Sequence, residues 1–395
     1  MELSEMKAGS AANIVNTYGE RRLSFVRGEG TNLWDSTGRE YLDFFSGISV
    51  TNLGHCHPAV TDALCAQANA LLHVSNLYYI EPQVQLAALL CAHSFADRWF
   101  FCNSGAEANE AAIKIARRYW AQKGTPRPVI LTAKKSFHGR TLTTLSATGQ
   151  PKYQEGFEPL PPGFEYVEYN DIESLRVAMR PEVGAVMLEP VLGESGIVVP
   201  DENYLADVRA ICDEHDALMI LDEIQTGSGR TGKLFAYMHS DITPDILTVA
   251  KGLGNGVPIG AMGCTEAVAA GFAPGTHGTT FGGNPLCTAA ALATMQTMTA
   301  PGFLERAAEV GAHFAAGLNA LAAKYDSIVT VRVKGLMYGV ELTKSVNPLI
   351  DAMAEAGVVC GPAGPQVLRF LPPLIISTEE ADEVLAKLDT ALGAF

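Results

Sequence analysis

The sequence is short of charged residues and has no long apolar run. Charged side chains make up 18% of the 395 residues and hydrophobic ones 48%, which excludes a disordered chain and suits a compact α/β protein. No apolar stretch reaches membrane-spanning length, so no transmembrane segment is expected. The opening residues Met1–Lys7 lack an apolar core and do not resemble a signal peptide. We therefore expect a soluble, cytoplasmic protein.

Positive charge is scarce. Lys and Arg number 28 against 43 Asp and Glu, and the formal net charge is -15. An acidic body repels nucleic acids and anionic membranes, so neither is an expected partner. Binding of an anionic small molecule would depend on individual arginines.

Paired cysteine motifs are also missing. None of the eight cysteines forms a C-x-x-C pair, and several lie in apolar runs where buried free thiols are common. This pattern predicts a reducing compartment, with no disulfide framework and no zinc site. The run His55-Cys56-His57 has poor ligand spacing, because adjacent residues of a strand point to opposite faces, so we expect no metal there.

The chain is long enough for more than one domain. Its middle alternates helical patterns with continuous apolar runs, which predicts an α/β fold with a mainly parallel sheet covered on both faces. These runs are Arg98–Cys102, Val129–Thr132, Gly184–Leu188, Ala217–Leu221 and Ile246–Ala250.

The two ends of the chain predict a smaller α+β domain. Short strands are expected near the N-terminus at Leu23–Arg27, Asn32–Trp34 and Tyr41–Phe44. Helices Phe303–Tyr325 and Glu379–Leu392 flank the expected strands Ser327–Val333, Met337–Leu342 and Val367–Phe370. We predict residues 1–55 to pack with the small domain, 56–297 to form a large domain and 298–395 to form the C-terminal small domain.

Polar residues come directly or shortly after all five central strands. In parallel sheets ligands bind outside the carboxyl ends of the strands, so these residues are expected to share one site. In chain order they are Asn103–Ala106, Phe137–Arg140, Glu189, Asp222–Gln225 and Lys251.

Lys251 and Asp222 are the pair that a pyridoxal-phosphate enzyme needs. A lysine carries the cofactor, and an aspartate keeps its ring nitrogen protonated. The glycines at 252, 254 and 256 leave room beside Lys251, and apolar surroundings favour a neutral, nucleophilic amine. The alternatives are a solvated lysine and an aspartate that caps the next loop.

The remaining contacts of such a cofactor also have candidates. Ser104, Gly105 and Ala106 open a helix whose free N–H groups could hold a phosphate, although an ordinary helix cap has the same sequence. Phe137 and Ile224 could press the two faces of a flat ring, with core packing as the alternative.

Three further polar side chains are candidates for the ring and for the substrate. Gln225 could reach an oxygen on the cofactor ring or be only a polar loop residue. Arg140 could bind a substrate carboxylate or be a surface arginine. Arg369 lies among apolar residues and needs an anion, for which Glu194 or a second carboxylate of the substrate is the candidate.

Taken together, these residues resemble the class III aminotransferases of the fold-type I pyridoxal-phosphate superfamily. The likeness covers nearly the whole chain. It is carried by Phe25–Gly30, Leu33–Asp35, Tyr41–Asp43, Gly54–Pro58, Asn103–Ala108, Phe137–Thr141, Leu221–Gly227, the Lys251 loop and His277–Pro285. The resemblance implies a large domain with a mainly parallel seven-stranded sheet and a smaller α+β domain built from both chain ends.

The resemblance also implies roles for single residues. Lys251 would carry pyridoxal 5'-phosphate, Asp222 would pair with its ring nitrogen, and Ser104–Ala106 would hold its phosphate. Thr280 would reach the phosphate of a partner subunit, so the site would need a homodimer. Tyr18 and Arg140 would lie in the substrate pocket.

Within the family, the chain most resembles the branch that acts on acetylornithine. Gly47-Ile48 with Val50, and Gly361-Pro362 near Arg369, fit that branch. The branch transfers the terminal amine of N2-acetylornithine to 2-oxoglutarate by a ping-pong route. Glu194 would pair with Arg369 while this long substrate binds and would release it when glutamate binds.

Alternatives to this branch remain open. The donor could be succinylornithine, ornithine, 4-aminobutyrate or succinyl-diaminopimelate. An aminomutase and a catalytically silent binding protein are rivals from other classes. Three residues depart from the family pattern near the expected pocket, namely Leu192, Glu20 and Arg22.

Overall fold

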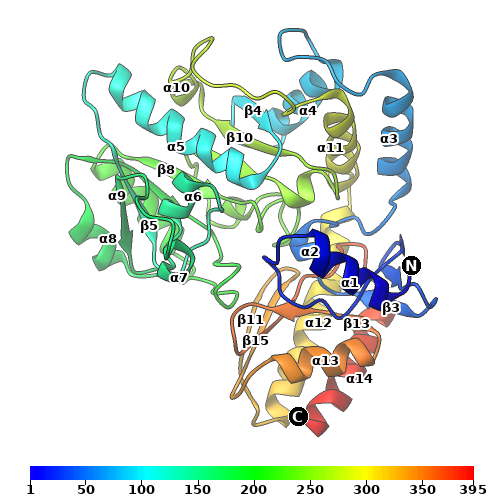
Figure 1. Ribbon diagram of the computed structural model, residues 1–395. Coiled ribbons are helices and arrows are strands. Elements are labelled where there is room, and N and C mark those ends of the chain that lie inside the picture. Colours follow the sequence, from blue (N-terminus) through cyan, green and yellow to red (C-terminus); the bar gives the residue numbers. More distant parts are fainter.

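A seven-stranded sheet forms the centre of the chain (Figure 1). The computed structural model describes residues 1–395 and gives the strand order β4-β10-β9-β8-β7-β5-β6. Only β10 runs opposite to the other six strands, which confirms the predicted mainly parallel sheet. The strands are β4 (Arg98–Cys102), β5 (Val129–Ala133), β6 (Phe164–Val167), β7 (Val183–Leu188), β8 (Leu218–Asp222), β9 (Ile246–Val249) and β10 (Gly260–Cys264).

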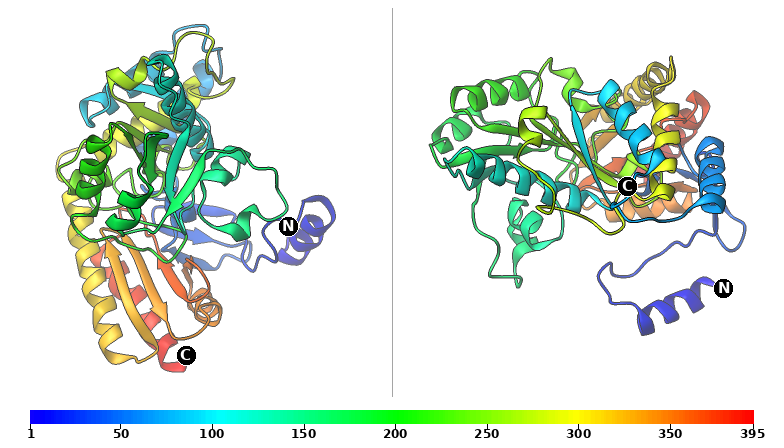
Figure 2. Two further views of the ribbon diagram at one scale, coloured as in Figure 1. Left: turned by 90° about the vertical axis from the view of Figure 1, so that its left-hand side faces the viewer. Right: turned by 90° about the horizontal axis from the view of Figure 1, so that it is seen from above.

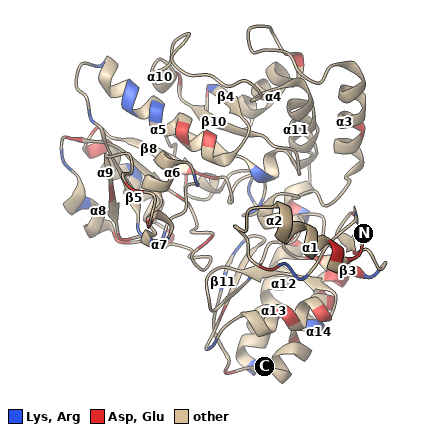
Figure 3. Cartoon of the chain, in the orientation of Figure 1, with Lys and Arg blue, Asp and Glu red and all other residues tan.

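Both faces of this sheet are covered, which explains its continuous apolar runs. Successive residues of a strand point to opposite faces. In β8, Leu218 and Ile220 pack in one apolar cluster with helix α5 (Gly105–Gln122), whereas Met219 and Leu221 pack in another with helix α9 (Tyr204–Glu214). The central strands carry few charged residues, and most charges lie on helices and loops (Figure 3).

Two strands of the sheet were not predicted, β6 at its edge and the antiparallel β10. Strand β10 reads Gly-Ala-Met-Gly-Cys, a composition with little strand propensity. Its glycines are required by packing. A Cβ at Gly260 would lie 2.4 Å from the carbonyl oxygen of Ser104, and one at Gly263 would lie 2.8 Å from the ring of Trp99.

The two chain ends meet in a second region with two four-stranded sheets. One has the order β11-β12-β15-β14, and the other has the order β1-β2-β3-β13, in which β13 pairs parallel with β3. Their strands are β1 (Arg27–Glu29), β2 (Asn32–Trp34), β3 (Glu40–Asp43), β11 (Ile328–Lys334), β12 (Met337–Leu342), β13 (Val358–Val359), β14 (Gly361–Pro362) and β15 (Val367–Phe370). The predicted bounds Leu23–Arg27 are wrong, because β1 begins only at Arg27, and of the residues before it only Val26 donates a backbone hydrogen bond to β2, to the carbonyl oxygen of Trp34 (2.9 Å).

The remaining helices connect and cover these sheets. They are α2 (Ser46–Ser49), α3 (Pro58–Ala70), α4 (Glu81–Ala92), α6 (Leu142–Ala147), α7 (Pro151–Gln154), α8 (Ile172–Ala178), α10 (Glu266–Ala269), α11 (Pro285–Met298), α12 (Phe303–Lys324), α13 (Asn347–Glu355) and α14 (Thr378–Ala394), with 3-10 turns η1 (Ala236–His239) and η2 (Lys251–Leu253). Ser377 and Glu380 form a capping box that starts α14.

Helix α1 (Leu3–Asn13) projects from the rest of the chain in both views of Figure 2. It buries no residue, so it gains little from packing within this chain. No helix has the length and apolarity that a membrane crossing requires.

A buried arginine joins the large sheet's loops to both chain ends. Arg230 is completely buried and donates to Ser49 Oγ (2.9 Å), Asn52 Oδ1 (2.6 Å) and the carbonyl oxygens of Leu336 (3.1 Å) and Pro372 (2.5 Å). None of these acceptors is a carboxylate, and burial lowers the pKa of Arg230 to about 9.

Candidate active site

A cavity of about 460 Å³ lies at the carboxyl edge of the parallel strands. All five predicted groups of polar residues contribute to its wall, together with Val50 and the segment that leads into β10. The lining residues are Val50, Asn103, Ser104, Gly105, Ala106, Phe137, His138, Gly139, Arg140, Glu189, Asp222, Ile224, Gln225, Ala250, Lys251, Gly256, Val257, Pro258 and Ile259. Lys251 and Asp222 therefore line the same cavity.

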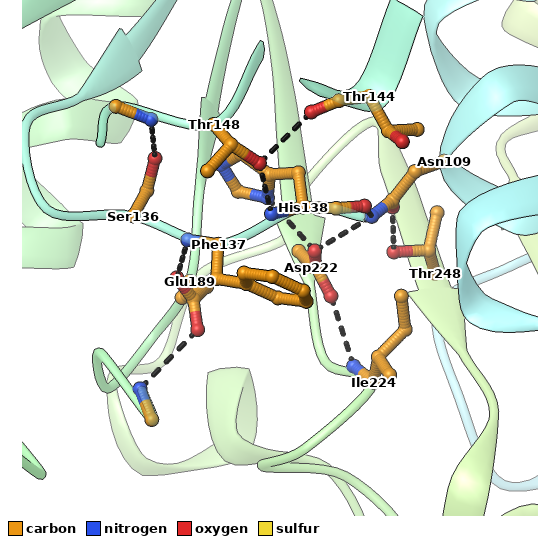
Figure 4. A network of polar contacts seen from close by, with 12 residues as sticks. Asn109, Ser136, Phe137, His138, Thr144, Thr148, Glu189, Asp222, Ile224 and Thr248 are labelled. Carbon is orange, nitrogen blue, oxygen red and sulfur yellow. Dashed lines mark hydrogen bonds and ion pairs between the residues drawn. The ribbon is translucent and has the colours of Figure 1, made fainter. Parts of the chain in front are cut away.

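Asp222 is almost fully buried at the end of β8 and accepts three hydrogen bonds (Figure 4). Its Oδ2 atom accepts from Asn109 Nδ2 (2.7 Å) and from His138 Nδ1 (2.8 Å), and its Oδ1 atom accepts from the backbone N–H of Ile224 (3.1 Å). No lysine or arginine side chain contacts this carboxylate. A buried carboxylate without a lysine or arginine partner is suited to bind a cationic atom of a ligand.

Lys251 follows β9 and begins the turn η2 with a left-handed backbone, φ 46°. Burial lowers the pKa of Lys251, while Glu194 is the strongest of the groups that oppose the shift. Its ammonium group forms no ion pair and donates no hydrogen bond within the chain. The amine is thus partly buried, free and easier to deprotonate than a surface lysine.

The start of helix α5 forms a cradle for an anion. Ser104 caps the helix by accepting the N–H of Glu107 (3.2 Å), and the N–H groups of Gly105 and Ala106 point out of the first turn without a partner. A Cβ at Gly105 would lie 2.7 Å from Ile224 Cδ1, so a larger residue here would displace the Ile224 side chain.

Phe137 and Arg140 form the outer wall of the cavity. The Phe137 ring stands edge-to-face with Tyr153 at 5.9 Å. The Arg140 guanidinium lies over both rings, 5.4 Å from the centroid of Phe137 and 4.1 Å from that of Tyr153. Arg140 is exposed and has no carboxylate partner, so its fork is free to bind one.

Arg369 and Glu194 form an ion pair next to the cavity. Arg369 Nη1 donates to Glu194 Oε1 (2.7 Å), and Gln225 Nε2 donates to the same oxygen (3.2 Å). Burial alone would raise the pKa of Glu194, but the charge and hydrogen bond of Arg369 outweigh it and lower that pKa. Arg369 is only 2% exposed, and its Nε–H has no acceptor.

Tyr18 and Thr280 do not reach the cavity within a single chain. Tyr18 is 81% exposed in the segment after α1, because that segment runs away from the sheets. Thr280 lies on an exposed loop after α10 and lines a separate hollow with His277 and Phe281. The predicted places of Tyr18 in a substrate pocket and of Thr280 at a phosphate stay predictions.

The three residues that depart from the family pattern each have a local partner. Leu192 is buried and forms a β-bridge with Val198. Glu20 pairs with Lys7 (2.8 Å), and Arg22 pairs with Asp351. None of the three departures points into the cavity.

Sequence reasoning missed two buried residues behind Asp222. Asn109 on α5 and Thr248 on β9 are both completely buried, and they join Asp222 in one network (Figure 4). A polar residue on the buried, alanine-rich face of α5 was the available signal. His138 belongs to the same network.

Two buried glutamates lie beside the network. Desolvation raises the pKa of Glu189 and of Glu223 to about 7. Glu189 accepts the backbone N–H of Phe137 (2.8 Å) and of Gly193 (3.3 Å). These two hydrogen bonds connect the loop that carries Phe137 to the loop that carries Glu194.

Stability is expected to depend on pH through Glu223. Its folded pKa of about 7 lies above its ordinary value of 4.5, so its contribution to stability is complete below pH 4.5 and is lost as pH rises through 7. Glu223→Gln removes this dependence but places an NH₂ group against the N–H of Ala236 or Tyr237. The variant should be less stable than wild type at pH 5. The difference between their free energies of unfolding should become smaller by pH 7, by at most roughly 1.4 kcal/mol per pH unit. Urea unfolding at both pH values checks this, and a difference that stays the same contradicts it.

Comparison with known proteins decides the family. Residues 15–392 match the family model described as aminotransferase class-III. The chain belongs to this family. Class III aminotransferases are pyridoxal-phosphate enzymes that transfer an amine between small molecules, and this chain is one of them.

Individual members of the family are similar to the chain over nearly its whole length. The chain is 51% identical over 380 residues to an acetylornithine aminotransferase of Gloeobacter violaceus, covering 95% of each protein. A solved N-acetylornithine aminotransferase from Stenotrophomonas maltophilia is 39% identical, with a TM-score of 0.84 over 96% of this chain and 97% of that one. A solved ornithine aminotransferase from Toxoplasma gondii is 34% identical, with a TM-score of 0.96 over 100% of this chain and 96% of that one.

The cavity fits pyridoxal phosphate. The buried Asp222 carboxylate matches a protonated ring nitrogen, and the unpartnered N–H groups of Gly105 and Ala106 match a phosphate. Phe137 and Ile224 line the space between them, and Lys251 supplies a free amine.

Proposed function

We propose that this aminotransferase transfers the terminal amine of N2-acetyl-L-ornithine to 2-oxoglutarate. The products would be N-acetyl-L-glutamate 5-semialdehyde and L-glutamate, a step of arginine biosynthesis. The observation that carries the reaction type is the joint placement of Lys251 and Asp222 in one cavity. The choice of donor is supported by the acetylornithine aminotransferases that are about half identical to the chain over nearly its whole length.

The proposed chemistry assigns a task to each buried group. Bound pyridoxal phosphate supplies an electron sink that lowers the barrier to removing a proton from the amine-bearing carbon. Lys251, with its lowered pKa, would move that proton. Asp222 would hold the ring nitrogen, and the start of α5 would hold the phosphate.

One site must accept a terminal amine and then an α-amino acid. With Glu194 bound to Arg369, the arginine is neutralised and the pocket suits a long substrate that carries an amine at its end. If Glu194 moves away, Arg369 can bind a carboxylate of 2-oxoglutarate or glutamate. Val50, which follows the left-handed turn at Ile48 (φ 68°), lines the cavity with an apolar side chain, and an acetylated substrate has no free α-amine that would need a polar partner there.

Replacing Glu194 with alanine should shift the balance between the two half-reactions. Arg369 would be free, so KM for 2-oxoglutarate should fall and KM for acetylornithine should rise, each by about tenfold, the equivalent of one charge-assisted hydrogen bond. Steady-state kinetics with both substrates checks this. Glu202→Ala is the control, because Glu202 is exposed. Equal changes in both KM values would contradict the proposed exchange.

A panel of amine donors tests the function itself. The purified holoenzyme is assayed for glutamate formation from 2-oxoglutarate with acetylornithine, succinylornithine, ornithine, 4-aminobutyrate and succinyl-diaminopimelate. We expect the highest kcat/KM with acetylornithine. The second candidate is ornithine, favoured by the 0.96 TM-score to the Toxoplasma gondii enzyme. A higher kcat/KM with ornithine would replace the proposal.

We propose that the enzyme is a homodimer with shared sites. Leu77, Tyr78 and Tyr79 are 87%, 67% and 101% exposed, and Phe281 is 62% exposed. Asn76 donates to the Gly282 carbonyl oxygen (2.9 Å), so this apolar segment and the Thr280 loop form one surface. An exposed apolar surface of this kind is typical of an interface.

Sedimentation tests the dimer. Wild type should sediment at twice its 42.0 kDa chain mass, and Leu77→Asp should sediment as a monomer with reduced activity. Val177→Asp is the matched control, because Val177 is equally exposed but lies on α8, at the other side of the large sheet (Figure 1). A wild-type monomer with full activity would contradict the proposal.

We also propose a domain division at residues 55 and 297. The seven-stranded sheet lies wholly between these positions, and the strands on either side of them pair with each other through β3 and β13.

A further inference from the structure

Asn109 is an unusual residue for its position. It lies on the buried face of α5 between Ala108 and the pair Ala111 and Ala112, and its side chain is completely inaccessible. It does not line the cavity. Burial of an amide costs free energy unless each of its polar atoms has a hydrogen-bond partner, so the presence of Asn109 at this position needs a reason.

Every polar atom of the Asn109 side chain is satisfied. Its Nδ2 atom donates to Asp222 Oδ2 (2.7 Å) and to the carbonyl oxygen of His138 (2.7 Å), and its Oδ1 atom accepts from Thr248 Oγ1 (2.7 Å). Two acceptors converge on one amide atom, which must therefore be the NH₂ group. The Thr248 hydroxyl fixes this orientation from the other side.

Thr248 has no contact with the cavity either. It is completely buried on β9, three positions before Lys251, and its hydroxyl has no partner besides Asn109. The chain Thr248–Asn109–Asp222 therefore runs from one strand of the site to the next through a helix (Figure 4).

The network makes the two oxygens of Asp222 unequal. Oδ2 accepts from both Asn109 and His138, whereas Oδ1 accepts only from the backbone N–H of Ile224 at 3.1 Å. Oδ1 is thus the oxygen with acceptor capacity left for a ligand. The carboxylate is held on three sides, so it cannot rotate to exchange its oxygens without breaking the network.

We propose that Asn109 and Thr248 are positioning residues that fix Asp222 for the ring nitrogen of the cofactor. This inference rests on the role of Asp222 in the proposed function. Thr248 orients the Asn109 amide, the amide holds Oδ2, and Oδ1 is left directed to the ring. Neither residue touches the cofactor, so both act through Asp222.

The test is a matched pair of variants at position 248. Thr248→Val removes the hydroxyl at nearly constant volume, and Thr248→Ser keeps the hydroxyl but loses a methyl group. The dissociation constant of pyridoxal phosphate for the apoenzyme is measured by fluorescence titration, together with kcat, KM and the melting temperature of each protein. We expect Thr248→Val to weaken cofactor binding and to lower kcat, each by about tenfold, with KM unchanged, because a partner of a buried group is lost. Thr248→Ser should bind the cofactor as wild type does.

A second variant covers the case in which Thr248→Val does not fold. Asn109→Leu removes the amide at similar volume and should weaken cofactor binding by at least as much. Asp222→Asn is measured beside both. The inference is overturned if Thr248→Val lowers the melting temperature alone, or if Thr248→Val and Thr248→Ser weaken binding equally, while Asp222→Asn weakens it. If Asp222→Asn itself leaves cofactor binding and kcat unchanged, the proposed role of Asp222 fails first.

Discussion

Lys251→Ala should lose transamination almost completely, with kcat/KM falling by at least about 10⁴-fold, the upper range for a positioned proton-transfer group. The loss follows from the site, since Lys251 is the only lysine that lines the cavity and no other side chain there offers a free amine. Transamination assays with acetylornithine and 2-oxoglutarate measure the effect. Cofactor binding should persist at reduced affinity, because the start of α5 and Asp222 remain.

Two controls make this result specific. Lys233→Ala removes an exposed lysine and should be as active as wild type. Borohydride reduction of wild-type holoenzyme, followed by peptide mapping, should find the cofactor on the peptide that contains Lys251. Labelling of a different lysine, or turnover by Lys251→Ala above about one thousandth of wild type, would remove the central assignment.

Asp222→Asn should be the second most damaging change. An amide cannot balance a protonated ring nitrogen, and the N–H groups of His138, Asn109 and Ile224 would meet its NH₂ group as well as its oxygen. We expect kcat to fall by about 10²–10³-fold, the cost of removing one preorganised electrostatic partner, and cofactor affinity to fall with it.

The matched control for this change is Asp207→Asn, which alters an exposed carboxylate on α9. It should leave kcat, KM and cofactor affinity as they are. Spectrophotometric titration of the apoenzymes with pyridoxal phosphate, together with steady-state kinetics, compares the three proteins. An Asp222→Asn enzyme within threefold of wild type in kcat would show that the ring nitrogen has another partner.

The five strand ends could be predicted from the sequence because each central strand is buried on both faces. Such strands are continuous apolar runs, and the first polar residue after each run marks its carboxyl end. Asp222 and Lys251 were found in this way, and the structure places both in the cavity wall. The pairing of Arg369 with Glu194 followed from the cost of burying an unpaired charge.

Other features depend on packing between distant segments. Strand β10 is paired on both sides, yet its glycines give no strand pattern, because they are selected by contacts with Ser104 and Trp99. Thr248 and Asn109 are far apart in the sequence, and only the placement of α5 on the sheet brings them together. The run Leu23–Arg27 has strand composition throughout, but only its last residue belongs to the strand that pairs with β2, so composition alone misplaced this strand.

The reversed direction of β10 has a consequence for redesigning this enzyme. Because β10 returns between β9 and β4, the loop that follows Lys251 ends against the carbonyl oxygen of Ser104, with no room for even a methyl group at Gly260. The floor of the active site is therefore a rigid unit in which the amine-bearing loop and the anion cradle cannot be moved separately. Attempts to widen the enzyme for bulkier donors should leave the floor intact and alter the rim, where Arg140 is solvent-accessible and Val50 comes from a different part of the chain.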